Sequence, residues 1–368
     1  MNVAKVRSRR ELRAFIEHPY TKYAGHPFWV PPLRVDERAQ LDQHKDPFFD
    51  HAEMELYLAR SQGRVVGRVA AIHDHRHQQV HGEKITSFGF YEADSQECAQ
   101  LLMARVEDWA RRREDVAVRG PFNPSLNHTA GFQIDAFDRV PFLMTPYSPA
   151  EYPEHMQRLG YEKIKDLYAW HLDYSSSIDR RLERIAERVQ RQKGMTIRAL
   201  NMKAFDRELA SVLEIMSLAW ADNWGFIPPT EREFAQLAKQ LKMIVDPKLI
   251  LFAEIADKTV AFSVTLPDLN QILRKIDGRL FPFGLLRLLL GRKKVDRVRM
   301  PLLGVLPEYR GKGLFAPLIM RSIEAARNAG FKTGECSWVL EDNIDMNRAI
   351  QALGAHHYKT YRIYQKLL

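Results

Sequence analysis

Cysteine is scarce in this chain and long apolar runs are absent. The 368 residues include two cysteines, Cys98 and Cys336, far apart in the sequence. This spacing argues against a disulfide framework and favours a reducing compartment. The residues before Ile16 lack the apolar core of a signal peptide, and no stretch approaches the ~18 apolar residues that span a bilayer. These absences predict a cytoplasmic protein, or one held peripherally on the inner face of the cytoplasmic membrane.

The common nucleotide-binding and nucleic-acid-binding motifs are also missing. The chain has no GxxxxGK[ST] loop and no GxGxxG fingerprint, so neither a P-loop nor a dinucleotide fold is expected. It carries a formal net charge of +9, which attracts phosphate-bearing partners such as nucleic acids, coenzyme A and anionic lipids. Because no zinc-finger or RRM motif accompanies this charge, we expect no nucleic-acid partner.

A basic, glycine-rich turn is the most informative feature that the chain does have. An apolar run over 298–305 predicts a strand, and residues 314–329 predict a helix. Between them, Gly311 and Gly313 allow a sharp turn in which consecutive N–H groups point into one concave space. The positive end of the helix, Arg310 and Lys312 add charge of the same sign. The arrangement suits a pyrophosphate.

This turn resembles the acyl-CoA-binding loop of the Gcn5-related N-acetyltransferase (GNAT) superfamily, whose pattern is R/Q-x-x-G-x-G/A after a strand ending in V-x-P. Arg310 and Gly313 match the loop, and Val305-Leu306-Pro307 matches the strand end. Phe315 stands where glycine or alanine is usual, with Ala316 one place later. The resemblance implies acyl-CoA as a co-substrate and no permanently bound cofactor. It also implies these cofactor-binding residues: Val305, Arg310, Gly311, Lys312, Gly313, Leu314, Phe315 and Ala316.

The same series of elements is expected twice along the chain. An aromatic segment ending in a double proline occurs at 26–32 and again at 223–229, and a hairpin follows at 55–72 and at 249–266. The order β–α–α–β–β–β–α–β–α–β in each half resembles two tandem GNAT-like domains. The resemblance implies an α/β fold in which each domain has a mixed, mostly antiparallel central sheet flanked by helices.

Only the second half carries the glycine turn, which assigns different roles to the two copies. After its fourth strand the first half has Glu92 and Asp94 and no glycine loop. We therefore expect a degenerate N-terminal domain over 1–172, an N-capped linker helix over 173–194, and a catalytic, acyl-CoA-binding domain over 195–368.

The resemblance places the thioester between the fourth and fifth strands of the second copy, where an amine attacks it directly. Backbone N–H groups near Val305 could polarise the thioester carbonyl. Direct attack also needs a proton acceptor. Glu335, on the fifth strand and on the same face as Ser337, is the candidate general base, and a structural salt bridge is the alternative. Cys336 is expected to be a buried thiol.

Two further positions follow from the same resemblance. Asn343 corresponds to the asparagine that holds the pantetheine arm in many members, and a simple helix N-cap is the alternative. The tyrosine that often serves as general acid should fall at Ile350 and is absent. Tyr358, Tyr361 and Tyr364 follow at positions that do not match, so the general acid stays open.

The acceptor side of the predicted site is apolar. Trp220, Trp224 and Phe226 lie in the region that shapes the acceptor site in this superfamily, although core packing is the alternative. The segment over 280–294 places bulky apolar residues beside a basic cluster, which suits a membrane interface. It could instead wall an acyl-chain channel or form a packed crossover helix.

Together these features resemble the bacterial ceramide synthases, a Gcn5-related family. The resemblance implies transfer of a long fatty acyl chain from CoA to the amine of a sphingoid base. The implied partners are acyl-CoA, a lipid amine acceptor and an anionic membrane contacted through 280–294.

Two other functions stay open, and the metal content is a separate question. One is acetyl-CoA-dependent acetylation of a small amine or a protein lysine, and the other is a non-catalytic acyl-CoA sensor or scaffold.

His73, His75, His77 and His81 are expected to share a strand face by their spacing. They lack a matching carboxylate or cysteine set, so we expect no metal.

Overall fold

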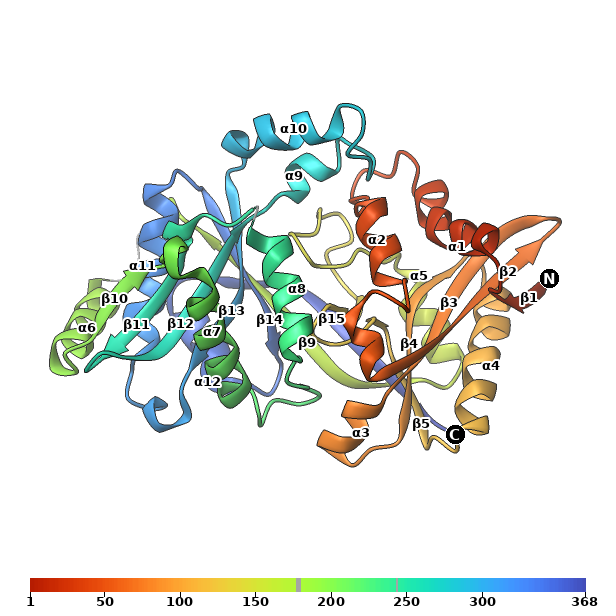
Figure 1. Cartoon of the computed structure of the whole chain (residues 1–368), viewed down its shortest axis with the longest axis horizontal. Coiled ribbons are helices and arrows are strands. Elements are labelled where there is room, and N and C mark those ends of the chain that lie inside the picture. The colour runs from red at the N-terminus through yellow and green to blue at the C-terminus, as the bar shows by residue number, and fades with distance from the viewer. Residues whose placement is uncertain (177–179, 243) are drawn as a thin grey trace. The chain divides into compact units, whose positions relative to one another are not determined.

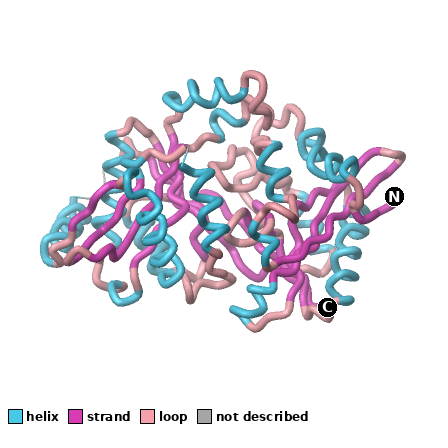
Figure 2. Tube along the Cα trace, in the orientation of Figure 1, coloured by secondary structure: helices cyan, strands magenta, loops and turns pink. Residues whose placement is uncertain are grey.

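The computed structural model describes residues 1–176, 180–242 and 244–368, which form two compact units. Unit 1 comprises 1–167, 270–290 and 359–368, and unit 2 comprises 168–269 and 291–358. Each unit is a layer of strands with helices against it (Figures 1 and 2). The domain boundaries expected at 172 and 195 separate two copies of one fold. The compact units take residues from both halves of the chain, so they do not test these boundaries, which stay a prediction.

The strands of unit 1 form a mixed, mostly antiparallel sheet. In order they are β1 (Asn2–Lys5), β2 (Ala52–Ser61), β3 (Arg64–Asp74), β4 (Ile85–Ala93), β5 (Ala117–Gly120) and the final part of β15 (His356–Leu367). Neighbouring strands run antiparallel except β4 and β5, which pair in parallel from Ile85↔Ala117 to Ser87↔Arg119. The last strand pairs antiparallel with β5, from Tyr364↔Gly120 to Leu367↔Ala117.

Two long helices cover opposite faces of this sheet because successive strand residues point to opposite sides. Ala70 and Ile72 of β3 pack in the cluster that contains Phe15 of α1 (Arg9–Lys22). Val69 and Ala71 pack in the cluster built on α4 (Gln96–Arg112). Shorter elements complete the unit: α2 (Arg34–Gln40), α3 (His75–His81), β6 (Phe122–Asn123), β7 (Thr129–Ala130), β8 (Phe132–Gln133), α5 (Glu151–Arg158), α9 (Asn270–Leu273) and α10 (Gly284–Gly291).

The gap that opens where β4 and β5 separate is filled by the chain itself. A Cβ added to Gly89 would lie 1.7 Å from the carbonyl oxygen of Phe122, so the two backbones are in direct contact. The N–H of Phe90 donates to the side-chain oxygen of Asn123 at 2.6 Å. Residues of β6 therefore occupy the edge of β4 beyond its pairing with β5.

The histidines of this unit do not share a strand face, so that expectation was wrong. Strand β3 ends at Asp74, and His75, His77 and His81 belong to helix α3, which Asp74 caps. The rings of His73, His75 and His77 lie within 3.3 Å of the carboxylates of Asp115, Glu53 and Glu83 respectively. Among the described residues, no group of three or more histidine, cysteine or acidic side chains is placed to hold a metal ion.

Unit 2 has a second mixed sheet of the same kind. Its order is β9 (Glu162–Asp173, from Tyr168 onward), β14 (Thr333–Leu340), β13 (Arg297–Val305), β12 (Lys258–Pro267), β11 (Ile250–Ile255) and β10 (Thr196–Ala199). Its helices are α6 (Arg180–Gln192), α7 (Phe205–Ala219), α8 (Glu231–Lys242), α11 (Phe315–Asn328) and α12 (Ile344–Ala352). Strands β10 to β13 are antiparallel, and β13 and β14 are parallel. The predicted fold class is confirmed in both units.

The helices of the chain bear on two of the expectations. Helix α6 lies within the range expected for the linker helix, and its role as a linker stays a prediction. Ser177 and Asp179, which were expected to begin this helix, lie outside the described residues. Over the parts of the chain that the structure covers, none of the helices combines the length and the apolar character needed to cross a bilayer.

Candidate active site

The central feature of unit 2 is the point where β13 and β14 part. They pair in parallel from Arg297↔Thr333 to Met300↔Cys336. Both strands are described in full, and each runs on, to Val305 and Leu340, without a further pair between them. The first residue after the last pair is Pro301, which has no N–H to donate to a ladder. A gap therefore opens between the two strands beyond this proline.

The edge of β13 that borders this gap carries backbone groups for hydrogen bonding. Leu302 and Gly304 pair with β12, and the N–H of Leu306 donates to the carbonyl of Val260 at 2.9 Å. In an antiparallel pair the groups of alternate residues point to opposite sides. The N–H and C=O of Leu303 and Val305 are therefore directed away from β12, toward the side of the gap.

The turn after β13 has the conformation that its glycines predict. A 3₁₀ turn at Pro307–Tyr309 is followed by Gly311 at φ 69° and Gly313 at φ 78°, and α11 begins at Phe315. Both φ values lie in the left-handed region that favours glycine. The turn leads directly from the open edge of β13 to the positive end of a helix, which is a suitable place for an anion.

The two cations of the turn have different surroundings. The guanidinium of Arg310 donates to the carbonyl of Ala219 at the end of α7 and lies 3.7 Å from the carboxylate of Asp222. The ammonium of Lys312 lies 5.0 Å from the centre of the Tyr309 ring. Arg310 thus ties the turn to α7, whereas Lys312 is exposed on the turn itself.

Helix α6 borders the turn on another side. A Cβ added to Gly313 would lie 3.3 Å from a methyl group of Val189 on α6. Leu182 of the same helix packs in the cluster that contains Ile319 and Ile323 of α11. Gly313 therefore combines a left-handed backbone with a close neighbour, and both restrict substitution there.

Glu335 lies one residue before β13 and β14 separate, and its side chain is buried. Its Oε1 accepts from the hydroxyl of Ser337 at 2.5 Å and lies 3.8 Å from Nε of Arg299, the residue opposite it on β13. Its Oε2 accepts from the hydroxyl of Tyr358. The structure thus shows an ion pair and two hydrogen bonds, which orient the carboxylate at the base of the gap.

Cys336 points to the other face of β14 and packs with α11 and α12. Burial, together with the negative charge of Glu335, raises the pKa of this thiol to about 12. At neutral pH Cys336 is therefore protonated, and a protonated thiol is a poor nucleophile. The Cys336 side chain is half-buried rather than fully buried, and its protonated state argues against a covalent acyl-enzyme.

The other predicted residues of unit 2 are partly brought together. Nε1–H of Trp220 donates to the carbonyl of Leu303 at 3.2 Å, on the gap side of β13, and the Trp220 ring meets that of the buried Phe226 edge to face at 5.6 Å. Trp224 is half-buried in the segment between them. The side-chain oxygen of Asn343 accepts from the N–H of Met346 at 3.2 Å, so Asn343 caps α12.

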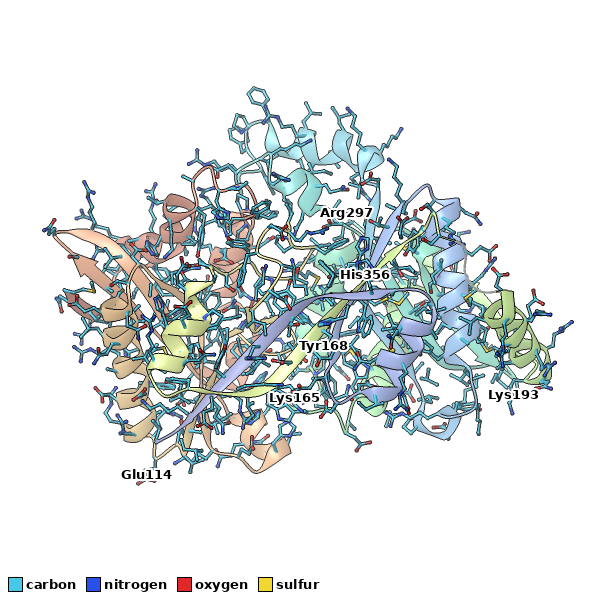
Figure 3. The ribbon with its side chains drawn as sticks, turned by 180° about the vertical axis from the view of Figure 1, so that it is seen from behind. Glu114, Lys165, Tyr168, Lys193, Arg297 and His356 are labelled. Atoms are coloured by element: carbon cyan, nitrogen blue, oxygen red, sulfur yellow. The ribbon has the colours of Figure 1, made fainter. Side chains whose placement is uncertain are left out.

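Sequence reasoning missed the surroundings of Glu335. Arg299 is one of two arginines in β13, and its pairing with Glu335 follows only from the register of β13 against β14. Tyr358 had been set aside because its spacing did not match, and β15 brings its hydroxyl to Glu335 nonetheless. Figure 3, which views the chain from behind, labels His356 on β15 and Tyr168 on β9. Ile350, in the position expected for the acid, is buried with Leu353.

The parted parallel strands, the glycine turn and the duplicated sheet are the features of a tandem GNAT fold. A solved structure, the tandem GNAT protein from the clavulanic acid biosynthesis pathway, matches 100% of this chain and 98% of its own with a TM-score of 0.58 at 12% identity. No family model matches the chain.

Two relatives cover almost the whole sequence. The chain is 36% identical over 378 aligned residues to the bacterial ceramide synthase of Caulobacter vibrioides (strain NA1000 / CB15N), covering 100% of this chain and 98% of that protein. It is 35% identical over 368 residues to protein YghO of Escherichia coli (strain K12), covering 98% and 93%. The chain belongs to the family of the bacterial ceramide synthase.

Proposed function

We propose that this N-acyltransferase moves a long fatty acyl chain from acyl-CoA to the amine of a sphingoid base. The observation that carries acyl transfer is the open edge of β13, which runs directly into the left-handed glycine turn and the start of α11. The sphingoid acceptor is inferred from the full-length likeness to a protein named bacterial ceramide synthase.

In this proposal the acyl-CoA lies along β13. The pantetheine arm pairs with the N–H of Leu303 and the carbonyl of Val305 as an added strand would, because the carbonyl of Leu303 accepts from Trp220. The pyrophosphate sits on N–H groups of the turn around Gly311 and Gly313, near Lys312 and the positive end of α11. The N–H groups of Arg310, Lys312 and Ala316 donate within the turn, to the carbonyls of Pro307, Tyr309 and Gly313. Asn343, at the start of α12, contacts the arm through the part of its amide that does not cap the helix.

The chemical step is a direct displacement at the thioester. The amine nitrogen forms a bond to the carbonyl carbon, the C–S bond breaks, and coenzyme A leaves as its thiol. Glu335 takes the proton of the ammonium through a water molecule, and Ser337, Arg299 and Tyr358 hold its carboxylate in place. The N–H of Val305 stabilises the negative charge on the carbonyl oxygen.

The remaining assignments concern the acceptor and its surroundings. Trp220, Trp224 and Phe226 form an apolar wall for the sphingoid chain near β13. The segment 280–294 contacts an anionic membrane from the cytoplasmic side. The first copy of the fold, over 1–172, is a degenerate domain, because β6 fills the gap where a thioester would lie.

Release of coenzyme A thiol by the purified protein tests the proposal. Palmitoyl-CoA or acetyl-CoA is supplied with sphinganine, and N-acetylsphinganine, which has no free amine, is the matched control acceptor. We expect release with palmitoyl-CoA and sphinganine alone. Release with acetyl-CoA and small amines would instead favour an acetyltransferase, and acyl-CoA binding without release would favour a sensor.

A further inference from the structure

Large apolar side chains face solvent on α10 and on the turn before it. We name the six residues concerned the α10 patch: Phe281, Phe283, Leu285, Leu286, Leu289 and Leu290. Phe281 is 87% exposed, Leu290 is 68% exposed, and each of the others is more than half exposed. A contiguous apolar surface of this kind marks an interaction site rather than ordinary surface.

The patch occupies one side of the helix. At about 100° per residue, Leu285, Leu286, Leu289 and Leu290 fall within one broad arc of α10. Gly284 and Leu288, on the remaining side, are buried and half-buried respectively. The apolar arc is therefore turned away from the unit, and Figure 3 shows side chains of this pale cyan helix projecting outward.

The segment that carries the patch is fastened to unit 1 by polar contacts. The N–H of Arg34 donates to the carbonyl of Gly278 at 3.0 Å, and the side-chain amide of Asn270 donates to the carbonyl of Pro141 at 2.9 Å. Arg274 donates to the carbonyl of Pro27 at 3.1 Å. These contacts fix the base of the segment while its leucines and phenylalanines remain outside the core.

The charge of the segment selects the kind of partner. Residues 279–294 contain no acidic residue and five basic ones: Arg279, Arg287, Arg292, Lys293 and Lys294. Pairing the patch with that of a second copy would bring these like charges together. An anionic lipid surface accepts the apolar side chains and attracts the cations at the same time.

We propose that the α10 patch inserts into the interfacial layer of an anionic bilayer, with the helix lying along the surface. Leu285, Leu286, Leu289 and Leu290 enter the acyl boundary, and the flanking cations remain among the headgroups. The inference rests on the proposed function, because the purpose of this docking is to hold the enzyme where a lipid amine resides.

Vesicle cosedimentation of the full chain tests this docking. The probes are vesicles of phosphatidylglycerol and phosphatidylcholine in equal parts, and vesicles of phosphatidylcholine alone. We expect the protein to sediment with the anionic vesicles and less at high salt. Leu285→Ser with Leu289→Ser should weaken partitioning by about tenfold for each leucine, because each loses most of its apolar burial.

The matched control replaces two exposed apolar residues of unit 1 outside the patch, Val80→Ser with Leu101→Ser. We expect this variant to sediment like the wild type. Equal loss in both variants, or no sedimentation of the wild type, would overturn the proposal. So would light scattering that shows a dimer converted to a monomer by the two leucine substitutions, because the patch would then bind a second copy.

A transfer assay keeps this inference distinct from the proposed function. With a short-chain, water-soluble sphingoid amine and no vesicles, the leucine variant should match the wild-type rate, whereas with sphinganine embedded in vesicles it should be slower. Vesicle binding without transfer to any sphingoid amine would refute the proposed acceptor and leave the docking intact. Transfer with identical rates for both proteins on vesicles would refute the docking alone.

Discussion

Replacing Glu335 by glutamine separates a catalytic role of this carboxylate from a structural one. The amide has almost the same shape and keeps one oxygen for the hydroxyl of Ser337 and the guanidinium of Arg299. It cannot take the proton of an ammonium at neutral pH. If Glu335 is the general base, turnover at saturating substrate should fall by about 10² to 10⁴-fold, with little change in acyl-CoA affinity.

The same substitution should also lower the folding free energy of the protein. Glu335 is buried and pairs with Arg299 at 3.8 Å, which is long for an ion pair. Weakening that pair while keeping the hydrogen-bonding oxygen should cost about 1–3 kcal/mol of folding free energy. For a chain of this size the expected signal is a fall of a few degrees in Tm.

Coenzyme A thiol release, acyl-CoA titration and thermal unfolding together give the answer. Tyr358→Phe is the matched control, because it removes one hydrogen bond to Oε2 and keeps the carboxyl group of Glu335 with its contacts to Ser337 and Arg299. We expect it to lower turnover much less than Glu335→Gln does. If Glu335→Gln lowers Tm yet keeps turnover within about threefold of the wild type, the carboxylate is structural and the base is another group.

Three further outcomes are expected. Gly313→Trp should abolish CoA binding in calorimetric titration, because tryptophan would have to adopt φ 78° and would press on Val189. The control is Gly330→Trp, at an exposed glycine with positive φ and no neighbour within 4 Å. If Gly313→Trp binds CoA as tightly as the wild type, the turn is not part of the site. Burial lowers the pKa of His18 to about 4, so the free energy of unfolding should fall by about 3 kcal/mol as the pH falls from about 6.5 to 4. Thermal unfolding of His18→Gln should show a smaller fall over the same pH range, and a fall equal to that of the wild type would contradict this. Gln365→Ala should lower Tm, because Nε–H of Arg119 donates to Gln365 at 2.7 Å inside the sheet and an unpaired buried donor costs about 1–3 kcal/mol; an unchanged Tm would show that water replaces the amide.

Local patterns predicted the elements that position the site. The strand, turn and helix around Gly311 and Gly313 lie where the apolar run and the glycines indicated. Such features follow from side-chain periodicity and from the left-handed φ that glycine adopts readily. They require no knowledge of residues distant in the sequence.

Long-range features could not be predicted in this way. The contact between Glu335 and Tyr358 depends on where β15 lies, and the pairing of Arg299 depends on the register of β13 against β14. The apolar pattern of 280–294 left a membrane interface, a channel wall and a packed crossover helix open. Which of its apolar side chains face solvent follows only from the fold. His75 to His81 fold as a helix because Asp74 caps it, a local signal that the two-residue spacing of the histidines had hidden.

The last strand pairing of unit 1 has a consequence for how the protein is made. Residues 364–367 pair with β5, and Tyr364 is part of the core cluster beneath α4. During synthesis, the edge of β5 therefore stays open until residues 364–367 have left the ribosome, and an open edge invites pairing with other chains. A nascent or truncated first half would depend on chaperones for solubility, and a fusion placed directly after Leu367 would burden the folding of residues synthesised first.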